Sequence, residues 1–169
     1  MFNKLLSTLA VVLVMIAPAA SAEMNIVVLD PVRAILESDE AKVLAEAANK
    51  EMEPEIEELR VDAEEFQALQ AKLQKDGEVM SESERRKGIK DLEDMQADLQ
   101  FGQQKLQKQT QDKRQEILQA MAPKYEKVLN DLIQIDQIDL ILSPNQLQYG
   151  NPKHDISRRV TEKLNEASD

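Results

Sequence analysis

The chain of 169 residues holds few side chains that could perform covalent chemistry, and their spacing matches no catalytic motif. His154 is the single histidine, and a histidine acts as a general base only beside an oriented partner in a pocket. No cysteine is present, which removes thiol nucleophiles and Cys/His zinc sites. The 4 glycines are isolated from one another and form no phosphate-binding loop. We therefore predict that the protein is not an enzyme and holds no cofactor or metal.

Charge is the strongest chemical feature of the chain, and it is unevenly distributed. The net charge is -11, and so acidic a chain is a poor partner for nucleic acid or an anionic membrane surface. Residues 51–65 hold eight acidic residues against one base, whereas residues 99–115 hold four cations against one acid. The carboxylates are spread around a helix instead of converging on one point, so they predict no calcium site. The opposite charges of the two stretches favour a fold that places them side by side.

Adaptable side chains indicate where a flexible partner could be contacted. Methionine fits varied surfaces, and Met80 and Met95 lie outside the main apolar stripe of the chain, as does Phe101. Ordinary packing between helices is the alternative for such methionines. A tight basic cluster follows Met80 and consists of Arg85, Arg86 and Lys87, with Lys90. This cluster is either a contact for a partner or a lipid, or the solvated start of a helix.

The element that must position these residues is a long helical hairpin, expected over residues 49–123. Its apolar residues recur in steps of three and four, the spacing of a coiled-coil seam. The pattern breaks near residue 80, where Gly77 can end one helix and Ser81 with Glu84 can form the capping box of the next. The expected seam consists of Met52, Ile56, Leu59, Ala63, Phe66 and Leu73, with Leu69 beside it, and of Ile89, Leu92, Leu99, Leu106 and Ile117 on the return arm.

The middle of this hairpin should be compliant. Pro54 and Pro123 each remove a backbone hydrogen bond and can bend a helix. Gly102 thins the return helix, and polar residues at seam positions weaken packing. The expected polar row on the return arm is Gln96, Gln103 and Thr110, and Lys113 continues the leucine series.

Residues 23–48 and 124–169 should form one small body, between whose halves the hairpin is inserted. Strands are predicted at 25–29 and 138–142, with a short returning strand at 147–149. Asp155 is expected to cap a last helix with an apolar stripe of Ile156, Val160 and Leu164. The fold class is therefore α+β: a small β-rich oligomerisation body carrying a long antiparallel coiled-coil hairpin.

This body is too small to be stable alone. It has no disulfide and only about 75 residues, a size at which a hydrophobic core is marginal. We therefore expect the body to complete its core by associating with other copies of itself. The candidate residues for the shared core are Ile26, Val28, Ile138, Leu140 and Leu142.

Residues 1–22 have the pattern of a secretory signal peptide. Lys4 precedes an apolar core, and Ala20-Ser21-Ala22 supplies a cleavage pattern before Glu23. The apolar core has about a dozen residues, fewer than the roughly 20 that a membrane span needs. We expect the mature chain to be exported and soluble.

In the order of its elements the chain resembles the Skp, or OmpH, family of periplasmic chaperones. The resemblance covers the whole chain after the signal peptide, with local similarity at residues 138–142 and 155–164. It implies a periplasmic homotrimer in which three bodies share a β-barrel-like core and three hairpins surround a cavity. It also implies an ATP-independent holdase that binds unfolded outer-membrane proteins there, with the methionine, phenylalanine and basic candidates above as client contacts.

One departure from the family and one alternative function stay open. The best-known member of the family is strongly basic, whereas this hairpin is net acidic, so binding of lipopolysaccharide or anionic lipid is undecided. The alternative is a structural or adaptor protein whose hairpin docks onto an envelope complex. Such adaptors usually flank the hairpin with Gly-rich β domains, and the sequence shows none.

Overall fold

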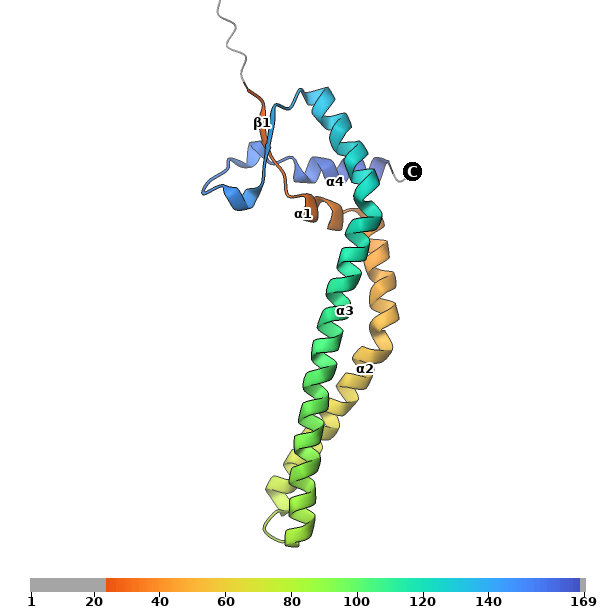
Figure 1. Cartoon of the computed structure of the whole chain (residues 1–169), viewed down its shortest axis with the longest axis vertical. Helices are drawn as coiled ribbons and strands as arrows, with labels where there is room; N and C mark the ends of the chain where they lie inside the picture. Colours follow the sequence, from red (N-terminus) through yellow and green to blue (C-terminus); the bar gives the residue numbers. More distant parts are fainter. Residues whose placement is uncertain (1–23, 168–169) are drawn as a thin grey trace, which may run out of the picture.

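A small body carries a single projecting helical hairpin (Figure 1). The computed structural model describes residues 24–167, so the predicted signal peptide lies outside the described residues. The elements in chain order are β1 (Ile26–Val28), α1 (Pro31–Leu36), α2 (Asp39–Asp76), α3 (Glu82–Asp136), β2 (Leu140–Leu142), the 3-10 helices η1 (Pro144–Gln146) and η2 (Pro152–His154), and α4 (Ser157–Glu166). The α+β fold class predicted from the sequence is confirmed.

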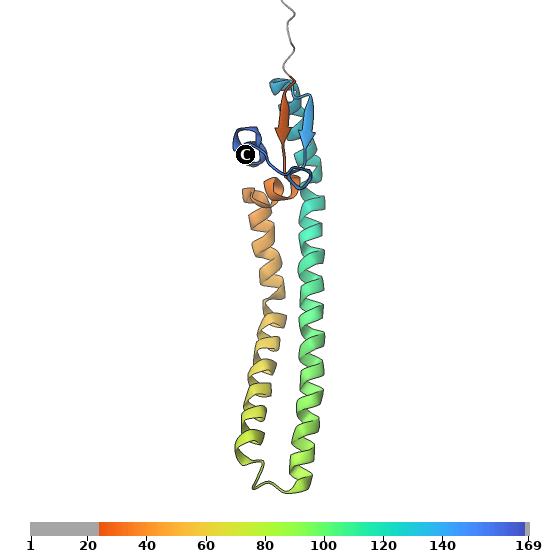
Figure 2. The same cartoon turned by 90° about the vertical axis from the view of Figure 1, so that its left-hand side faces the viewer.

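The hairpin consists of α2 and α3, which run side by side from the body to the tip (Figure 2). Gly77 follows the end of α2, and a Cβ there would lie 2.4 Å from the carbonyl oxygen of Leu73, closer than a side chain can approach. The predicted capping box begins α3: the backbone N–H of Glu84 donates to Ser81 Oγ at 3.3 Å, and the N–H of Ser81 donates to the Glu84 carboxylate at 2.9 Å. The helix end at Gly77 and the capping box at Ser81, both predicted from the sequence, are therefore present in the structure.

Neither proline inside the hairpin helices ends its helix. Pro54 lies within α2 and Pro123 within α3. Figure 1 shows α2 changing direction about halfway along its length, and α3 changing direction where it passes from the hairpin into the body. Both helices continue from the hairpin into the body without a break, so the body and the arm are mechanically connected by continuous helix.

The seam between the arms follows the expected spacing but differs in several members. Leu69 lies in the seam, whereas Ile56 is 45% exposed and its place is taken by Glu55. The predicted polar row on the return arm is wrong, because its three residues are exposed. Ile89, another predicted member, is 46% exposed. The buried and half-buried residues along the arms include Met52, Glu55, Leu59, Asp62, Ala63, Phe66, Leu69 and Leu73 on α2, and Gly88, Leu92, Met95, Leu99, Gly102, Leu106, Gln109, Lys113 and Ile117 on α3.

The arm is thinly packed away from its root. On α2 the last fully buried residue is Met52, and on α3 none is fully buried between Gly88 and Ile117. Two seam positions on α3 are glycines, and an added Cβ would come within 2.8 Å of Leu73 at Gly88 and of Leu59 at Gly102. The compliance expected of the arm stays a prediction, and the predicted polar row cannot be its cause because that row is exposed.

The body is built around one parallel strand pair and four helix segments. β1 pairs with β2 so that Ile26 lies opposite Leu140 and Val28 opposite Leu142. On one side of this pair lies the hydrophobic core, which reaches into the root of the hairpin. Its buried members are Leu29, Ala34, Ile35, Ala41, Ile117, Met121, Val128, Leu132, Val160 and Leu164. The predicted apolar stripe of the last helix thus faces the core, with Ile156 packed against its edge.

The second half of the body differs from its sequence prediction in two places. Residues 147–149 form no strand, because Pro144 starts a 3-10 turn that redirects the chain. Ile138 precedes β2 instead of lying in it: Gln137 adopts a left-handed backbone, with a φ of 51°, to end α3, and the chain becomes extended strand only at Leu140.

The start of α4 also differs from the prediction. Ile156, not Asp155, occupies the N-cap position. The Asp155 carboxylate still accepts the backbone N–H of Ser157 at 2.9 Å. The last residue of β1 also gains a neighbour here, since Val28 forms a β-bridge with Asp155 and its carbonyl accepts the N–H of Ile156.

Candidate functional site

One face of the strand pair is only partly covered by the rest of the body. Side chains alternate between the two faces of a strand, and residues paired in register share a face. Val27 is buried and Ile141 packs on the core, so the residues on either side of them point the other way. These residues define the assembly face: Ile26, Val28, Leu140 and Leu142. Four of the five candidate core residues are therefore brought together, and Ile138 lies half-buried just before them.

The assembly face is unusual for a parallel sheet. Such sheets are normally covered on both faces, yet Leu140 is 43% exposed and the other three residues are only half-buried. The sheet contains two strands, in the order β1-β2, within the described part of the chain. Two isolated strands are at best marginally stable, so this face is a candidate surface for contact with another chain.

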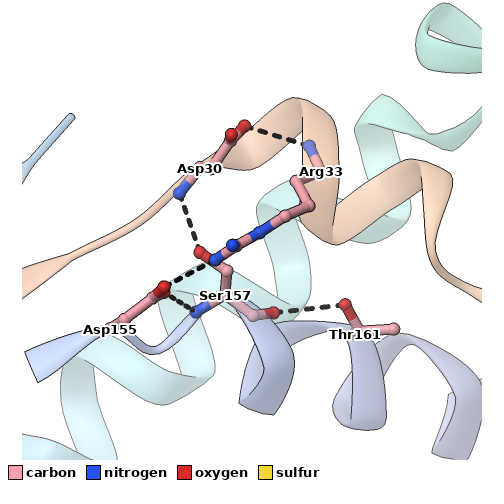
Figure 3. Close-up of polar contacts among 5 residues, drawn as sticks. All are labelled: Asp30, Arg33, Asp155, Ser157 and Thr161. Atoms are coloured by element: carbon pink, nitrogen blue, oxygen red, sulfur yellow. Dashed lines mark hydrogen bonds and ion pairs between the residues drawn. The ribbon is translucent and has the colours of Figure 1, made fainter. Parts of the chain in front are cut away.

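A polar clamp fixes the assembly face to the body (Figure 3). The fully buried hydroxyl of Ser157 accepts the backbone N–H of Asp30 at 2.9 Å, and Arg33 forms an ion pair with Asp155 at 2.6 Å. The hydroxyl of Thr161 donates to the carbonyl of Ala34 at 2.9 Å. Because Asp30 follows β1 and Ser157 begins α4, these bonds join the two ends of the chain and hold β1 in place.

The charges in this clamp stabilise one another. Burial opposes ionisation of Asp155, but hydrogen bonds from Ser157 and the ion pair with Arg33 outweigh it, so the pKa of Asp155 is lowered. The hydrogen bond to Asp155 in turn raises the pKa of Arg33. Both groups therefore stay charged at neutral pH. Their arrangement pairs no nucleophile with a base, and it is typical of a structural ion pair.

Ion pairs connect the two arms of the hairpin, as the charge distribution predicted. Lys105 contacts Glu55 at 3.1 Å, and Lys113 contacts Glu51 at 2.8 Å. A hydrogen bond from Gln109, followed by that from Lys105, lowers the pKa of Glu55. The predicted register, with the chain folding back near residue 80, is therefore confirmed by these cross-arm pairs.

The tip of the hairpin presents an apolar residue that the sequence analysis did not single out. Val79 is 86% exposed, whereas the neighbouring Met80 is half-buried. The sequence signal for the exposure of Val79 is its position in the turn that precedes the capping box. The basic candidates Arg85, Arg86 and Lys87 are all exposed, and Arg86 forms an ion pair with Glu82 at 2.9 Å.

The two other contact candidates differ in exposure. Phe101 is 70% exposed on α3, which leaves its ring available to a partner. Met95 is half-buried at a seam position, where helix packing accounts for it. Phe101 and the basic residues at the tip therefore remain candidate contacts on geometric grounds, and Met95 is the weaker one.

The remaining residues with chemical potential form no centre in residues 24–167. His154 is exposed at the end of η2. No group of three or more acidic, histidine or cysteine side chains in this range could hold a metal ion. The same range has no helix with the length and apolarity needed to span a membrane.

Fold and site together define a class of protein: a small α+β body with an uncovered apolar sheet face and a long hairpin that projects from it. A family model described as "Outer membrane protein (OmpH-like)" matches residues 25–164. The chain belongs to this OmpH-like family. Family membership supports a chaperone role.

Two known proteins are similar over most of their length. A "Skp-like protein" from Pseudomonas aeruginosa is 32% identical over 153 residues, which are 90% of this chain and 91% of the relative. A crystal structure described as that of an OmpH-like outer membrane chaperone from Caulobacter crescentus CB15 matches with a TM-score of 0.54 at 15% identity, covering 85% of each chain. At that identity the second match supports the fold alone.

Proposed function

We propose that the protein is an ATP-independent holdase of the periplasm that acts as a homotrimer and binds unfolded outer-membrane proteins between its hairpins. The observation that carries the proposal is the assembly face beside a projecting, thinly packed arm. The assembly face favours association with other copies of the chain, and the arms of the associated chains are then free to surround a partner.

Self-association is supported by the state of the strand pair. β1 has β2 on one side and the bridge to Asp155 on the other, whereas no strand lies along the outer edge of β2 in residues 24–167. Open edges and uncovered apolar faces favour pairing with another chain. Copies of the same body supply complementary apolar surface, and closing the association in a ring leaves no unpaired apolar face.

Client holding is supported by the properties of the arm. An unfolded chain offers many different apolar and charged segments, and a compliant surface can contact them through many weak interactions. The arm offers exposed Phe101 and Val79 together with the basic cluster at the tip. Such binding needs no nucleotide, because it lowers the concentration of free aggregation-prone chain by mass action.

The test of this function is suppression of aggregation. A urea-denatured outer-membrane β-barrel protein is diluted into buffer with and without the chaperone, and light scattering is followed in the absence of nucleotide. We expect scattering to fall to near background at about one trimer per client. Unchanged scattering, together with co-purification of one folded envelope complex, would instead support the adaptor function.

A further inference from the structure

A groove lies on the hairpin beside Gly102, where Leu59 of α2 packs close to the backbone of α3. It has a volume of about 190 Å³ and is lined by residues of both α2 and α3. We call it the Gly102 groove. Its apolar part is formed by Leu59, Leu106 and Gly102 itself, with Phe101 at its side. Small-molecule pockets have about 300–1,000 Å³, so this groove has room for one side chain instead of a cofactor.

Phe101 is the residue of the groove whose apolar side chain packing does not explain. It is 70% exposed although it lines the groove, whereas Leu59 and Leu106 are half-buried between the arms. An aromatic ring costs free energy when it is left in water, and its face attracts cations. The ring therefore completes a groove that offers both apolar contact and a site for positive charge.

The residues around the groove carry more negative than positive charge. Lys105 is the single cation among the lining residues, and Glu55 already pairs with it at 3.1 Å. Three further carboxylates line the groove, two from α2 and one from α3: Glu58, Asp62 and Asp98. None of the three forms an ion pair within residues 24–167. The groove thus presents uncompensated negative charge beside apolar surface and an exposed ring.

We propose that the Gly102 groove binds lysine and arginine side chains of extended, unfolded chain segments. The aliphatic stem of such a side chain can lie on the leucines and Gly102, while its cationic end meets the carboxylates and the face of Phe101. This inference rests on the proposed function and specifies which client segments the hairpin prefers. In this proposal the middle of the arm binds basic client segments, and the cationic tip binds acidic ones.

The test uses two fluorescein-labelled 15-residue peptides with no fixed structure, identical except that three arginines in one are glutamines in the other. Fluorescence anisotropy with the full protein gives the dissociation constant of each. We expect the arginine peptide to bind more tightly, and its advantage to shrink as salt is raised, because exposed charges are screened.

Variants separate the groove from the general acidity of the chain. Asp62→Asn with Asp98→Asn should remove most of the advantage of the arginine peptide. The matched control, Glu93→Gln with Asp94→Asn, removes the same charge at exposed residues of α3 outside the groove and should leave the advantage nearly intact. Phe101→Ala should weaken the arginine peptide roughly two- to fivefold, as expected for an exposed cation–π contact.

Equal effects of the groove and control variants would overturn the inference, because attraction would then come from net charge alone. The aggregation assay, run on the same proteins, distinguishes this failure from failure of the function. Suppressed aggregation without preference for arginine would contradict the proposed role of the groove and support the holdase function. Preference for arginine without suppressed aggregation would support the role of the groove and contradict the holdase function.

Discussion

Ser157 illustrates, at the scale of single residues, how the body holds its assembly face. Its side chain is fully buried, and its hydroxyl is the acceptor for the backbone N–H of Asp30, two residues after β1. Removing the hydroxyl leaves that N–H without its acceptor in a partly buried position. The cost of such a loss is the desolvation of the donor, about 1–3 kcal/mol.

We therefore predict that Ser157→Ala lowers the free energy of unfolding by about 1–3 kcal/mol. Urea unfolding followed by circular dichroism measures it, at one fixed chain concentration because self-association shifts the midpoint. Ser83→Ala, at an exposed residue of α3, is the control and should change little. Equal midpoints for the two variants would show that the clamp does not contribute.

Asp155 predicts a pH dependence. Its pKa is lowered in the folded protein, so its contribution to stability is present above the unfolded pKa and is lost as pH falls through the folded pKa. The stability difference between wild type and Asp155→Asn should thus be largest at neutral pH and shrink below about pH 4. The partners are partly exposed, so the difference should stay below about 1 kcal/mol. A difference that grows in acid would contradict this assignment.

The hairpin shows, at the scale of elements, what the sequence could and could not reveal. The turn signals at Gly77, Ser81 and Glu84 act locally, so they predicted the ends of both helices correctly. The seam pattern predicted the leucine positions but misassigned the polar ones. Glu55 is tolerated between the arms because Lys105 and Gln109 on the other arm bond to it, and such cross-arm partners are invisible to a pattern read along one helix.

Prediction of the body from the sequence also succeeded only in part. Both strands follow from short, continuous apolar runs, and the buried stripe of the last helix follows from apolar residues at steps of four. The segment after Pro144 was predicted as a strand because its composition fits one. Its actual path is set by the 3-10 turn and by the bridge between Val28 and Asp155, contacts between residues far apart in sequence.

The compliance of the arm can be tested at Gln109. Its Nε2 donates to Glu55 at 3.2 Å, while its Oε1 is buried and accepts no hydrogen bond within residues 24–167. We predict that Gln109→Leu stiffens the arm, because a seam leucine packs and an unsatisfied acceptor is removed. Hydrogen exchange of the amides in residues 50–62 and 100–115 should slow several-fold, since each 1.4 kcal/mol is worth a factor of ten.

The matched control for this change is Gln104→Leu, which adds a leucine at an exposed residue of the same helix. It should leave exchange in the middle of the hairpin unchanged. If compliance serves binding, Gln109→Leu should also need more chaperone per client to suppress aggregation. Faster exchange in Gln109→Leu would mean that the bond to Glu55 holds the arms together and that the seam does not tolerate leucine.

The molecule as a whole combines a body that lacks part of its covering with arms that bury little of their own surface. Its described core lies on one side of the strand pair and in the hairpin root. The other side, the assembly face, is apolar and open. The proposal that the arms surround a client depends on what closes this face, because only an assembly with its bodies joined places several arms around one partner.

The molar mass of the protein in solution tests this point most directly, by light scattering coupled to size exclusion over a range of concentrations. We predict three times the mass of one chain for the wild type and for Val79→Asp, a control at the hairpin tip far from the body. We predict dissociation for Leu140→Asp, which places a charge on the assembly face. A folded wild-type protein with the mass of a single chain at all concentrations would contradict the account.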